Sequence, residues 1–300
     1  MMFSTLSSEG GNRRGVTRVE DRLELRLPVG PAILFCPADR PDRYHKALAS
    51  ADTVIIDLED AVAVDRKGMA REALATALPH LPVERTVVRI NSPRTADGRA
   101  DIDLLCKSNL RFVMVPKVEC PEDISSLAPL SVIALCETAR GVEAAPDIAR
   151  LDDCVGMMWG GEDLTADIGG RRSRRSDGSY LPHVEYARSR VLIAAAAAGI
   201  SAWDGVYLDI PDLVGLRAEC DEAVAMGFAA KVAIHPTHAD VIRQAYRPTP
   251  AQLAWARKLL AALEKSEFGV VSFEGQMVDG PVVAMARAIV ASQPHQSLTS

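Results

Sequence analysis

The chain has 300 residues, a length that fits one large domain or two modest ones. Hydrophobic residues make up 48% of the sequence and charged residues 25%, so a substantial core can form and a disordered chain is excluded. The formal net charge is -6 and the basic residues are dispersed apart from one short arginine-rich run. This pattern argues against nucleic acid as a partner and leaves small anionic ligands open.

The six cysteines have no spacing typical of a zinc site or a redox motif, which favours reduced thiols. No stretch approaches the roughly 20 apolar residues that span a bilayer. Residues 1–26 carry charges where a signal peptide would have an apolar segment. We therefore expect a cytoplasmic protein with no membrane partner.

Short runs rich in apolar and β-branched residues recur along the chain and predict eight strands. Their nearly continuous apolar character is typical of a parallel sheet that helices cover on both faces. The runs are Ala32–Cys36, Thr53–Leu58, Thr86–Ile90, Phe112–Val115, Val132–Cys136, Val155–Trp159, Ala202–Leu208 and Lys231–Ile234.

Helix-like segments separate these runs, with Gly199 and Gly227 placed as C-terminal caps. Eight alternating units predict an α/β fold, a closed (β/α)8 TIM barrel over residues 30–247. An open doubly wound sheet is the alternative, but no Gly-x-Gly-x-x-Gly follows the first strand. Residues 1–29 are expected to form a mobile tail. The helical segments include Pro41–Ser50, Val64–Leu78, Val184–Ala198 and Leu213–Met226.

Residues 248–300 are predicted to form a short C-terminal helical extension beyond the barrel. Two helices, Ala251–Lys265 and Pro281–Ala291, flank a loop at residues 273–280 that contains two glycines. Such a loop suggests a lid, or an arm that reaches a neighbouring subunit.

Polar residues follow nearly every predicted strand. TIM barrels assemble their chemistry at the C-terminal ends of the strands, and charges there are costly unless they are paired or bind a ligand. These positions therefore predict the site. They are Asp39-Arg40, Asp57, Glu59-Asp60, Arg89, Asn91, Lys117, Glu137, Arg140, Glu162-Asp163, Asp209 and His235.

Glu137 and Asp163 follow the fifth and sixth strands, which are neighbours in a barrel, so their carboxylates can converge. Magnesium prefers oxygen ligands and retains waters, so two carboxylates plus substrate oxygens would complete its shell. The alternative is a salt bridge from these carboxylates to Arg140 or Lys117. Spacing alone does not choose between the two.

Arg89 ends the third strand, where its planar guanidinium could grip a substrate carboxylate or pair internally with Asp57 or Glu59. Asp57, Glu59 and Asp60 cannot all contact one metal ion. We expect them, with Lys117, to orient metal-bound waters or to pair with nearby cations.

Two further features have simpler interpretations. His235 is interpreted as a hydrogen-bonded packing residue rather than a base. The run Arg171-Arg172-Ser173-Arg174-Arg175 follows the sixth strand and is interpreted as a solvated surface loop rather than a phosphate site.

Taken together, these motifs resemble the citrate lyase beta subunit-like branch of the malyl-CoA and citryl-CoA lyases, within the HpcH/HpaI aldolase superfamily. The resemblance runs in order along about nine tenths of the chain. It is carried by Leu34–Pro41, Ile56–Asp60, Val88–Asn91, Val115–Lys117, Glu137–Gly141, Trp159–Leu164, Ile234–Pro236 and Phe273–Asp279.

The resemblance implies a TIM barrel that binds Mg2+ through Glu137 and Asp163. It also implies that Arg89 holds the carboxylate of a 2-oxo acid. Asp279 would arrive from an adjacent subunit as the catalytic acid or base, which implies a homo-oligomer, a trimer by analogy with the family.

The implied activity is magnesium-dependent cleavage of a 3-hydroxyacyl-CoA of the citryl-CoA, citramalyl-CoA or malyl-CoA type, or the reverse condensation. The partners would be an acyl-CoA thioester and oxaloacetate, pyruvate or glyoxylate. The alternatives are a CoA-independent 2-oxo acid aldolase, a thioesterase or malate-synthase-like enzyme, and a non-catalytic subunit.

Overall fold

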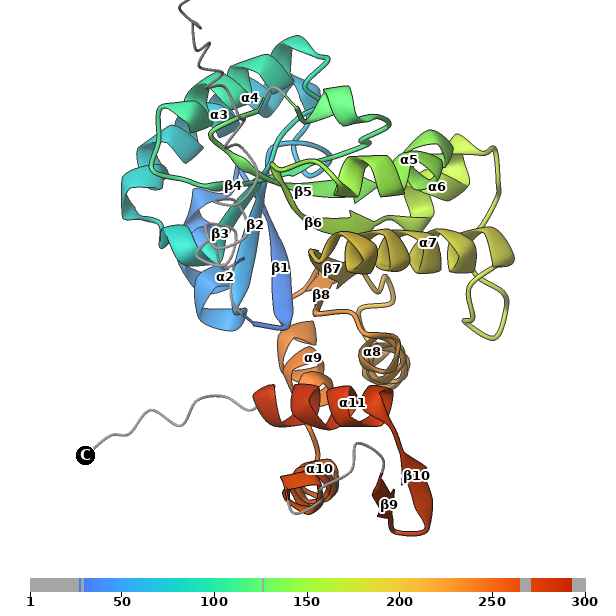
Figure 1. Ribbon diagram of the computed structural model, residues 1–300. Coiled ribbons are helices and arrows are strands. Elements are labelled where there is room, and N and C mark those ends of the chain that lie inside the picture. Colours follow the sequence, from blue (N-terminus) through green and yellow to red (C-terminus); the bar gives the residue numbers. More distant parts are fainter. Residues whose placement is uncertain (1–26, 28–29, 126, 265–270, 293–300) are drawn as a thin grey trace, which may run out of the picture.

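The computed structural model describes residue 27 and residues 30–125, 127–264 and 271–292. Within them, parallel strands β1 to β8 pair in sequence order, and β8 closes onto β1 through Ala32 opposite Lys231. The predicted (β/α)8 barrel is therefore confirmed (Figure 1). The strands are β1 (Ala32–Pro37), β2 (Thr53–Asp57), β3 (Thr86–Arg89), β4 (Phe112–Val115), β5 (Ser131–Cys136), β6 (Cys154–Trp159), β7 (Ser201–Asp204) and β8 (Ala230–Ala233).

The helices begin and end near the predicted signals. Gly199 and Gly227 take the left-handed conformation that ends α7 and α8, with φ of 70° and 104°. The helices are α2 (Tyr44–Ser50), α3 (Lys67–Ala77), α4 (Ala96–Cys106), α5 (Ala139–Ala149), α6 (Gly161–Asp167), α7 (Pro182–Ala198), α8 (Leu213–Met226), α9 (His238–Tyr246), α10 (Pro250–Glu264) and α11 (Gly280–Ala291). The tail expected at residues 1–29 lies outside the described residues except for Leu27.

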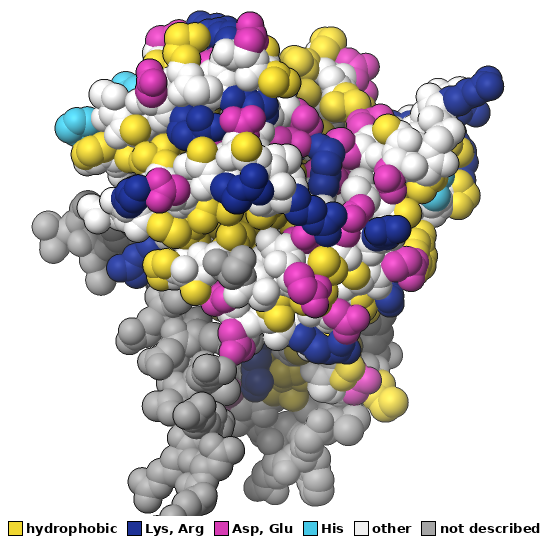
Figure 2. All heavy atoms as spheres, turned by 90° about the horizontal axis from the view of Figure 1, so that it is seen from above, with side chains coloured by type: hydrophobic (Ala, Val, Ile, Leu, Met, Phe, Trp, Pro, Cys, Tyr) yellow, Lys and Arg dark blue, Asp and Glu magenta, His cyan; other side chains and the backbone are white. Residues whose placement is uncertain are grey.

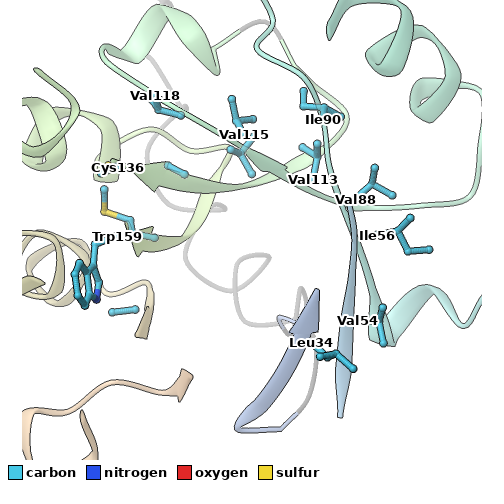
Figure 3. Close-up of a cluster of buried hydrophobic side chains, with 14 of the residues drawn as sticks. Leu34, Val54, Ile56, Val88, Ile90, Val113, Val115, Val118, Cys136 and Trp159 are labelled. Carbon is cyan, nitrogen blue, oxygen red and sulfur yellow. The ribbon is translucent and has the colours of Figure 1, made fainter. Parts of the chain in front are cut away.

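Alternate side chains along each strand enter two separate apolar clusters. One fills the inside of the barrel and includes Ile33, Ile55 and Val87. The other lies between the strands and the covering helices and includes Leu34, Val54 and Val88, as Figure 3 shows. Both faces of the strands are thus buried, which explains why they read as continuous apolar runs rather than alternating ones.

Several predicted strand ends differ from the structure by one residue, and two predictions differ by more. The seventh strand ends at Asp204 rather than Leu208, because its pairing with β8 stops at Asp204 opposite Lys231. The loop expected at residues 273–280 contains a hairpin of β9 (Val271–Phe273) and β10 (Gln276–Val278), and Glu274 and Gly275 at its turn have positive φ.

The C-terminal extension packs on itself. Ala256 and Leu259 of α10, Val278 of β10 and Ala286 of α11 form an apolar cluster separate from the barrel clusters. In Figure 1 the extension lies beyond α8 and α9, with the hairpin directed away from the barrel. No helix within the described ranges is long and apolar enough to cross a membrane.

Candidate active site

A cavity of about 90 Å³ opens where the barrel strands end. Its apolar lining comes from the barrel interior and includes Phe35, Leu135 and Met158. Its charged lining includes Arg89, Glu137 and Asp163. The structure therefore brings these three sequence-predicted residues to one cavity, at the end of the barrel where this fold carries out chemistry.

Glu137 directly follows β5 and is held in place by its neighbours. Thr138 caps α5 by accepting a hydrogen bond from the Gly141 N–H at 3.1 Å. The Glu137 carboxylate accepts one from the Lys117 N–H at 3.2 Å. A Cβ atom at Gly160 would lie 2.7 Å from Glu137 Oε2, so only glycine there leaves room for the carboxylate.

Burial raises the pKa of Glu137 to about 8, and the charge of Asp163 adds to this effect. Asp163 lies in the first turn of α6 and its side chain is partly exposed. A carboxyl group whose ionisation is opposed by burial and by a neighbouring carboxylate is typical of a functional site.

Lys117 is the cation nearest these carboxylates. Its φ of 51° is unusual for a residue with a side chain, and its ammonium group lies near four carboxylates. The Nζ atom lies 2.6 Å from Glu59, 3.4 Å from Asp163, 3.5 Å from Asp60 and 3.9 Å from Glu137. Burial opposes its charge, but the hydrogen bond to Glu59 and the charge of Glu137 raise the pKa of Lys117 overall. The salt bridge considered as an alternative to the metal site is thus present with Lys117.

Arg89 makes the internal ion pair that the sequence left as an alternative. Its Nε and Nη2 atoms donate to the two oxygens of Asp57 at 2.7 and 2.6 Å, and Nη1 lies 3.3 Å from Glu59 Oε2. Its guanidinium carbon also lies 4.6 Å from the centre of the Phe35 ring. A guanidinium has five N–H donors, so these contacts fix its plane and still leave donors for a ligand in the cavity.

The residues present fit a magnesium ion. Five carboxylates, those of Asp57, Glu59, Asp60, Glu137 and Asp163, gather around the two cations Arg89 and Lys117, so negative charge is in excess. In the described part of the chain, no three His, Cys, Asp or Glu side chains converge as a complete metal cage. A cation held by two carboxylates, with water or substrate oxygens completing the shell, is the arrangement that magnesium accepts.

The raised pKa of Glu137 predicts that magnesium affinity increases with pH. Below pH 8 the buried carboxyl is protonated in the metal-free protein, and cation binding requires the carboxylate. We expect the apparent affinity to fall about tenfold for each pH unit below 8 and to level off above it. Calorimetric titration with Mg2+ between pH 6 and 9 measures this slope, and a flat profile contradicts the prediction.

Among the other candidates, Asp57 accepts hydrogen bonds from the Glu59 and Ala61 N–H groups while it holds Arg89. Asp60 is exposed, and its carboxylate lies 3.5 Å from the Lys117 ammonium. His235 is partly exposed, its imidazole pairs with the Thr237 hydroxyl at 2.8 Å, and its ring lies edge-on to that of His238, which agrees with its interpretation as a hydrogen-bonded packing residue.

The interpretation of the arginine-rich run as solvated is wrong for its centre. Ser173 is buried, and Arg174 pairs with Glu219 of α8 and lines the cavity together with Tyr180. Sequence reasoning missed Arg174 and Tyr180 as site residues. The available signal was their place after β6, on the side of the barrel where ligands bind.

Asp279 lies apart from this cavity, between β10 and α11 of the extension. It is exposed and makes no side-chain capping bond to α11. Asp279 is therefore an exposed carboxylate on an extension with its own apolar cluster.

Comparisons with known proteins place the chain in a family. Residues 32–236 match HpcH/HpaI aldolase/citrate lyase. A citrate lyase subunit beta-like protein of Mycobacterium tuberculosis is 51% identical over 262 residues, which cover 87% of this chain and 95% of that protein. A (3S)-malyl-CoA thioesterase of Cereibacter sphaeroides is 33% identical (87% and 93% covered), and the mitochondrial citramalyl-CoA lyase of Homo sapiens is 30% identical (86% and 84% covered).

Solved structures agree with this placement. The chain is similar to protein CitE from M. tuberculosis in complex with magnesium, acetoacetate and coenzyme A, with a TM-score of 0.83, 51% identity, and 88% and 97% of the two chains covered. A second structure, citrate lyase beta subunit complexed with oxaloacetate and magnesium from M. tuberculosis, gives a TM-score of 0.71, 52% identity and coverage of 73% and 97%. The chain belongs to the HpcH/HpaI aldolase/citrate lyase family, in its citrate lyase subunit beta-like branch.

Proposed function

We propose that this protein is a magnesium-dependent carbon–carbon lyase that cleaves a 3-hydroxyacyl-CoA to acetyl-CoA and a 2-oxo acid, or catalyses the reverse condensation. The observation that carries the proposal is the excess of carboxylates beside Arg89 in a cavity of about 90 Å³. A divalent cation would balance that charge, and a short 2-oxo acid would suit a cavity of that size.

Relatives support the same reading. M. tuberculosis CitE is described with magnesium, acetoacetate and coenzyme A, and another structure from that organism holds oxaloacetate and magnesium. We assign to this chain the same classes of ligand: an acyl-CoA thioester and a 2-oxo acid such as oxaloacetate, pyruvate or glyoxylate. The identity of the acyl group of the thioester is left to experiment, since the relatives include both a citramalyl-CoA lyase and a malyl-CoA thioesterase.

Glu137 and Asp163 would hold the magnesium ion, which when bound supplies positive charge that polarises substrate oxygens. Arg89, fixed by Asp57, would pair with the carboxylate of the acid portion and orient the bond to be broken. Glu59 and Asp60, which lie beside Lys117, would hold a water that accepts the proton of the substrate hydroxyl.

Loss of the hydroxyl proton turns that C–O group into a carbonyl, and the electron pair of the broken carbon–carbon bond passes to the thioester as an enolate. Asp279 from a neighbouring copy would deliver a proton to the enolate carbon, and in condensation it would remove one. This assignment requires a homo-oligomer, which we propose to be a trimer.

A screen of citryl-CoA, citramalyl-CoA and malyl-CoA with purified protein tests the proposal and identifies the acyl group. We expect one of them to be cleaved with Mg2+ and none after chelation with EDTA. Aldol cleavage of CoA-free acids, or metal binding without turnover of any thioester, would instead favour the aldolase or the non-catalytic subunit.

Arg89→Lys is expected to weaken the binding of pyruvate or oxaloacetate by about tenfold or more, although the charge is kept. A lysine cannot reproduce the planar fork that Asp57 holds in position, and a charge-assisted pair contributes about 1.5–3 kcal/mol. Calorimetric titration in the presence of Mg2+ measures the change. Arg71→Lys is a matched control, because Arg71 pairs with Asp97 and Asp101 rather than at the cavity. Equal affinities in the parent and Arg89→Lys would make Arg89 a structural residue only.

A further inference from the structure

The segment between α6 and α7, residues 168–181, forms part of the active-site wall. Arg174 and Tyr180 face each other across an antiparallel bridge in this segment. The guanidinium carbon of Arg174 lies 3.8 Å from the centre of the Tyr180 ring and 5.2 Å from that of Tyr207. Tyr180 in turn packs edge-on against Trp159 at 5.3 Å. These stacked groups make a compact wall rather than a solvated loop.

This wall separates two cavities. On one side is the active-site cavity of about 90 Å³. On the other is a cavity of about 590 Å³ between α7 and α8, lined by Arg188, Gly215 and Glu222 among others. Arg174 and Tyr180 are the residues that line both. The separation of the small acid site from the larger cavity therefore depends on these two side chains.

The buried carboxylate of Glu219 holds the side chains of Arg174 and Tyr180 in place. Glu219 of α8 pairs with Arg174 Nη1 at 2.7 Å through one oxygen and accepts the Tyr180 hydroxyl at 2.8 Å through the other. Glu219 lines the larger cavity but not the active-site cavity. Its direct contacts with residues that line the active-site cavity are those with Arg174 and Tyr180.

Lys231 of β8 binds the Glu219 carboxylate. This fully buried lysine donates to Glu219 and to Asp204 at 2.8 Å each. Asp204 also accepts the indole N–H of Trp159 at 2.9 Å. Removing one partner of a buried ion pair is costly, because the other charge stays desolvated. The wall is thus tied to β7, β8 and α8 rather than left to move as a surface loop.

We propose that Arg174 and Tyr180 are specificity-determining residues that restrict the enzyme to 2-oxo acids with a short side chain, and that Glu219 is the positioning residue that holds them. The proposal rests on the proposed function, since it assumes that the 2-oxo acid occupies the cavity beside Arg89. A longer acid meets the wall, and removal of the wall gives its extra carbons the space behind.

The test compares Mg2+-dependent binding of pyruvate with that of 2-oxooctanoate, whose side chain is longer than that of oxaloacetate, by calorimetry, in the parent and in Arg174→Ala. One methylene in an apolar pocket changes affinity by about 10-fold or more, so the parent should clearly prefer pyruvate. In Arg174→Ala we expect that preference to shrink at least about tenfold through tighter binding of the longer acid. Unfolding or a general increase in flexibility would weaken the binding of both acids, so neither can tighten the binding of the longer acid alone.

Glu219→Gln should shrink the preference in the same direction, because an amide cannot neutralise Arg174. In the Arg174→Ala background, Glu219→Gln should add nothing further, which separates positioning through Arg174 from an independent effect. Glu222→Gln is the matched control: Glu222 lies on the same helix, lines the larger cavity and pairs with Arg188. It should leave the preference unchanged.

Arg174→Lys provides a second variant if the alanine chain does not fold, since it keeps the charge near Glu219 but cannot cover the Tyr180 ring, and it should show a smaller shift of the same sign. An unchanged preference in folded Arg174 variants, or an equal shift in Glu222→Gln, overturns the proposal. A parent that binds neither pyruvate nor oxaloacetate with Mg2+ contradicts the proposed function instead.

Discussion

Glu137→Gln and Asp163→Asn should each lower magnesium affinity by more than about 100-fold and reduce lyase activity to its level in EDTA. Residues that merely orient metal ligands already contribute about 10- to 100-fold, and these two carboxylates are proposed as the ligands themselves. Both changes keep the shape of the side chain, so the barrel should remain folded.

The melting temperature of the metal-free variants distinguishes loss of magnesium binding from loss of folding. In the metal-free protein Glu137 is a buried carboxyl whose pKa is raised to about 8, so folding is favoured at low pH and that contribution is lost as the pH rises through 8. Glu137→Gln removes this cost, and its metal-free melting temperature at pH 8 should equal or exceed that of the parent. Asp147→Asn, which alters an exposed ion pair with Arg150, is the control and should keep full magnesium affinity. Unaltered metal binding in both site variants would remove the proposed magnesium site.

Mixing two inactive chains should restore activity if Asp279 completes the active site of a neighbouring copy. Asp279→Ala retains the metal pair, and Glu137→Gln retains the extension. In a ring where every subunit gives one extension and receives one, about a quarter of the sites in an equal, random mixture combine both intact parts. We therefore expect roughly a quarter of the parent activity after co-assembly.

A mixture of Glu137→Gln with Asp163→Asn is the control, because both changes damage the metal pair and no combination repairs it. Activity that stays absent in verified mixed oligomers of Asp279→Ala and Glu137→Gln would place Asp279 in the site of its own chain or outside the chemistry. The exposed position of Asp279, on an extension with its own apolar cluster, motivates the in-trans assignment.

The barrel could be predicted from the sequence because its signal is local and repeated. Each strand is buried on both faces, so each appears as a short apolar run, and capping glycines mark the ends of α7 and α8. The seventh strand was predicted too long because Val206 and Leu208 continue the apolar pattern. β8 does not pair with the chain beyond Asp204, and the pairing of two strands distant in sequence cannot be read from a local pattern. The hairpin at the extension has three-residue strands, too short to show a period.

The sequence predicted those parts of the candidate site whose positions follow from the order of the strands. Glu137 and Asp163 follow adjacent strands, and the structure puts both within 4 Å of the Lys117 ammonium. The meeting of four carboxylates at that ammonium, on a residue with a left-handed backbone, was indicated by no sequence pattern.

Arg174 is the opposite case. Its partner Glu219 lies 45 residues further along the chain, and the sequence alone offers nothing to connect them. A run of arginines is usually solvated, so the local rule gave the wrong answer at the one position where a buried carboxylate from α8 meets the run.

The fate of the thioester tests the central claim most directly. Purified protein is incubated with the CoA thioester that it consumes, with Mg2+ and with EDTA, and acetyl-CoA, the 2-oxo acid and free CoA are quantified together. The account predicts acetyl-CoA and the 2-oxo acid in equal amounts, no early free CoA, and no turnover in EDTA. Accumulation of free CoA with the intact hydroxy acid would show a thioesterase, as in the C. sphaeroides relative, and would contradict carbon–carbon cleavage as the reaction of this site.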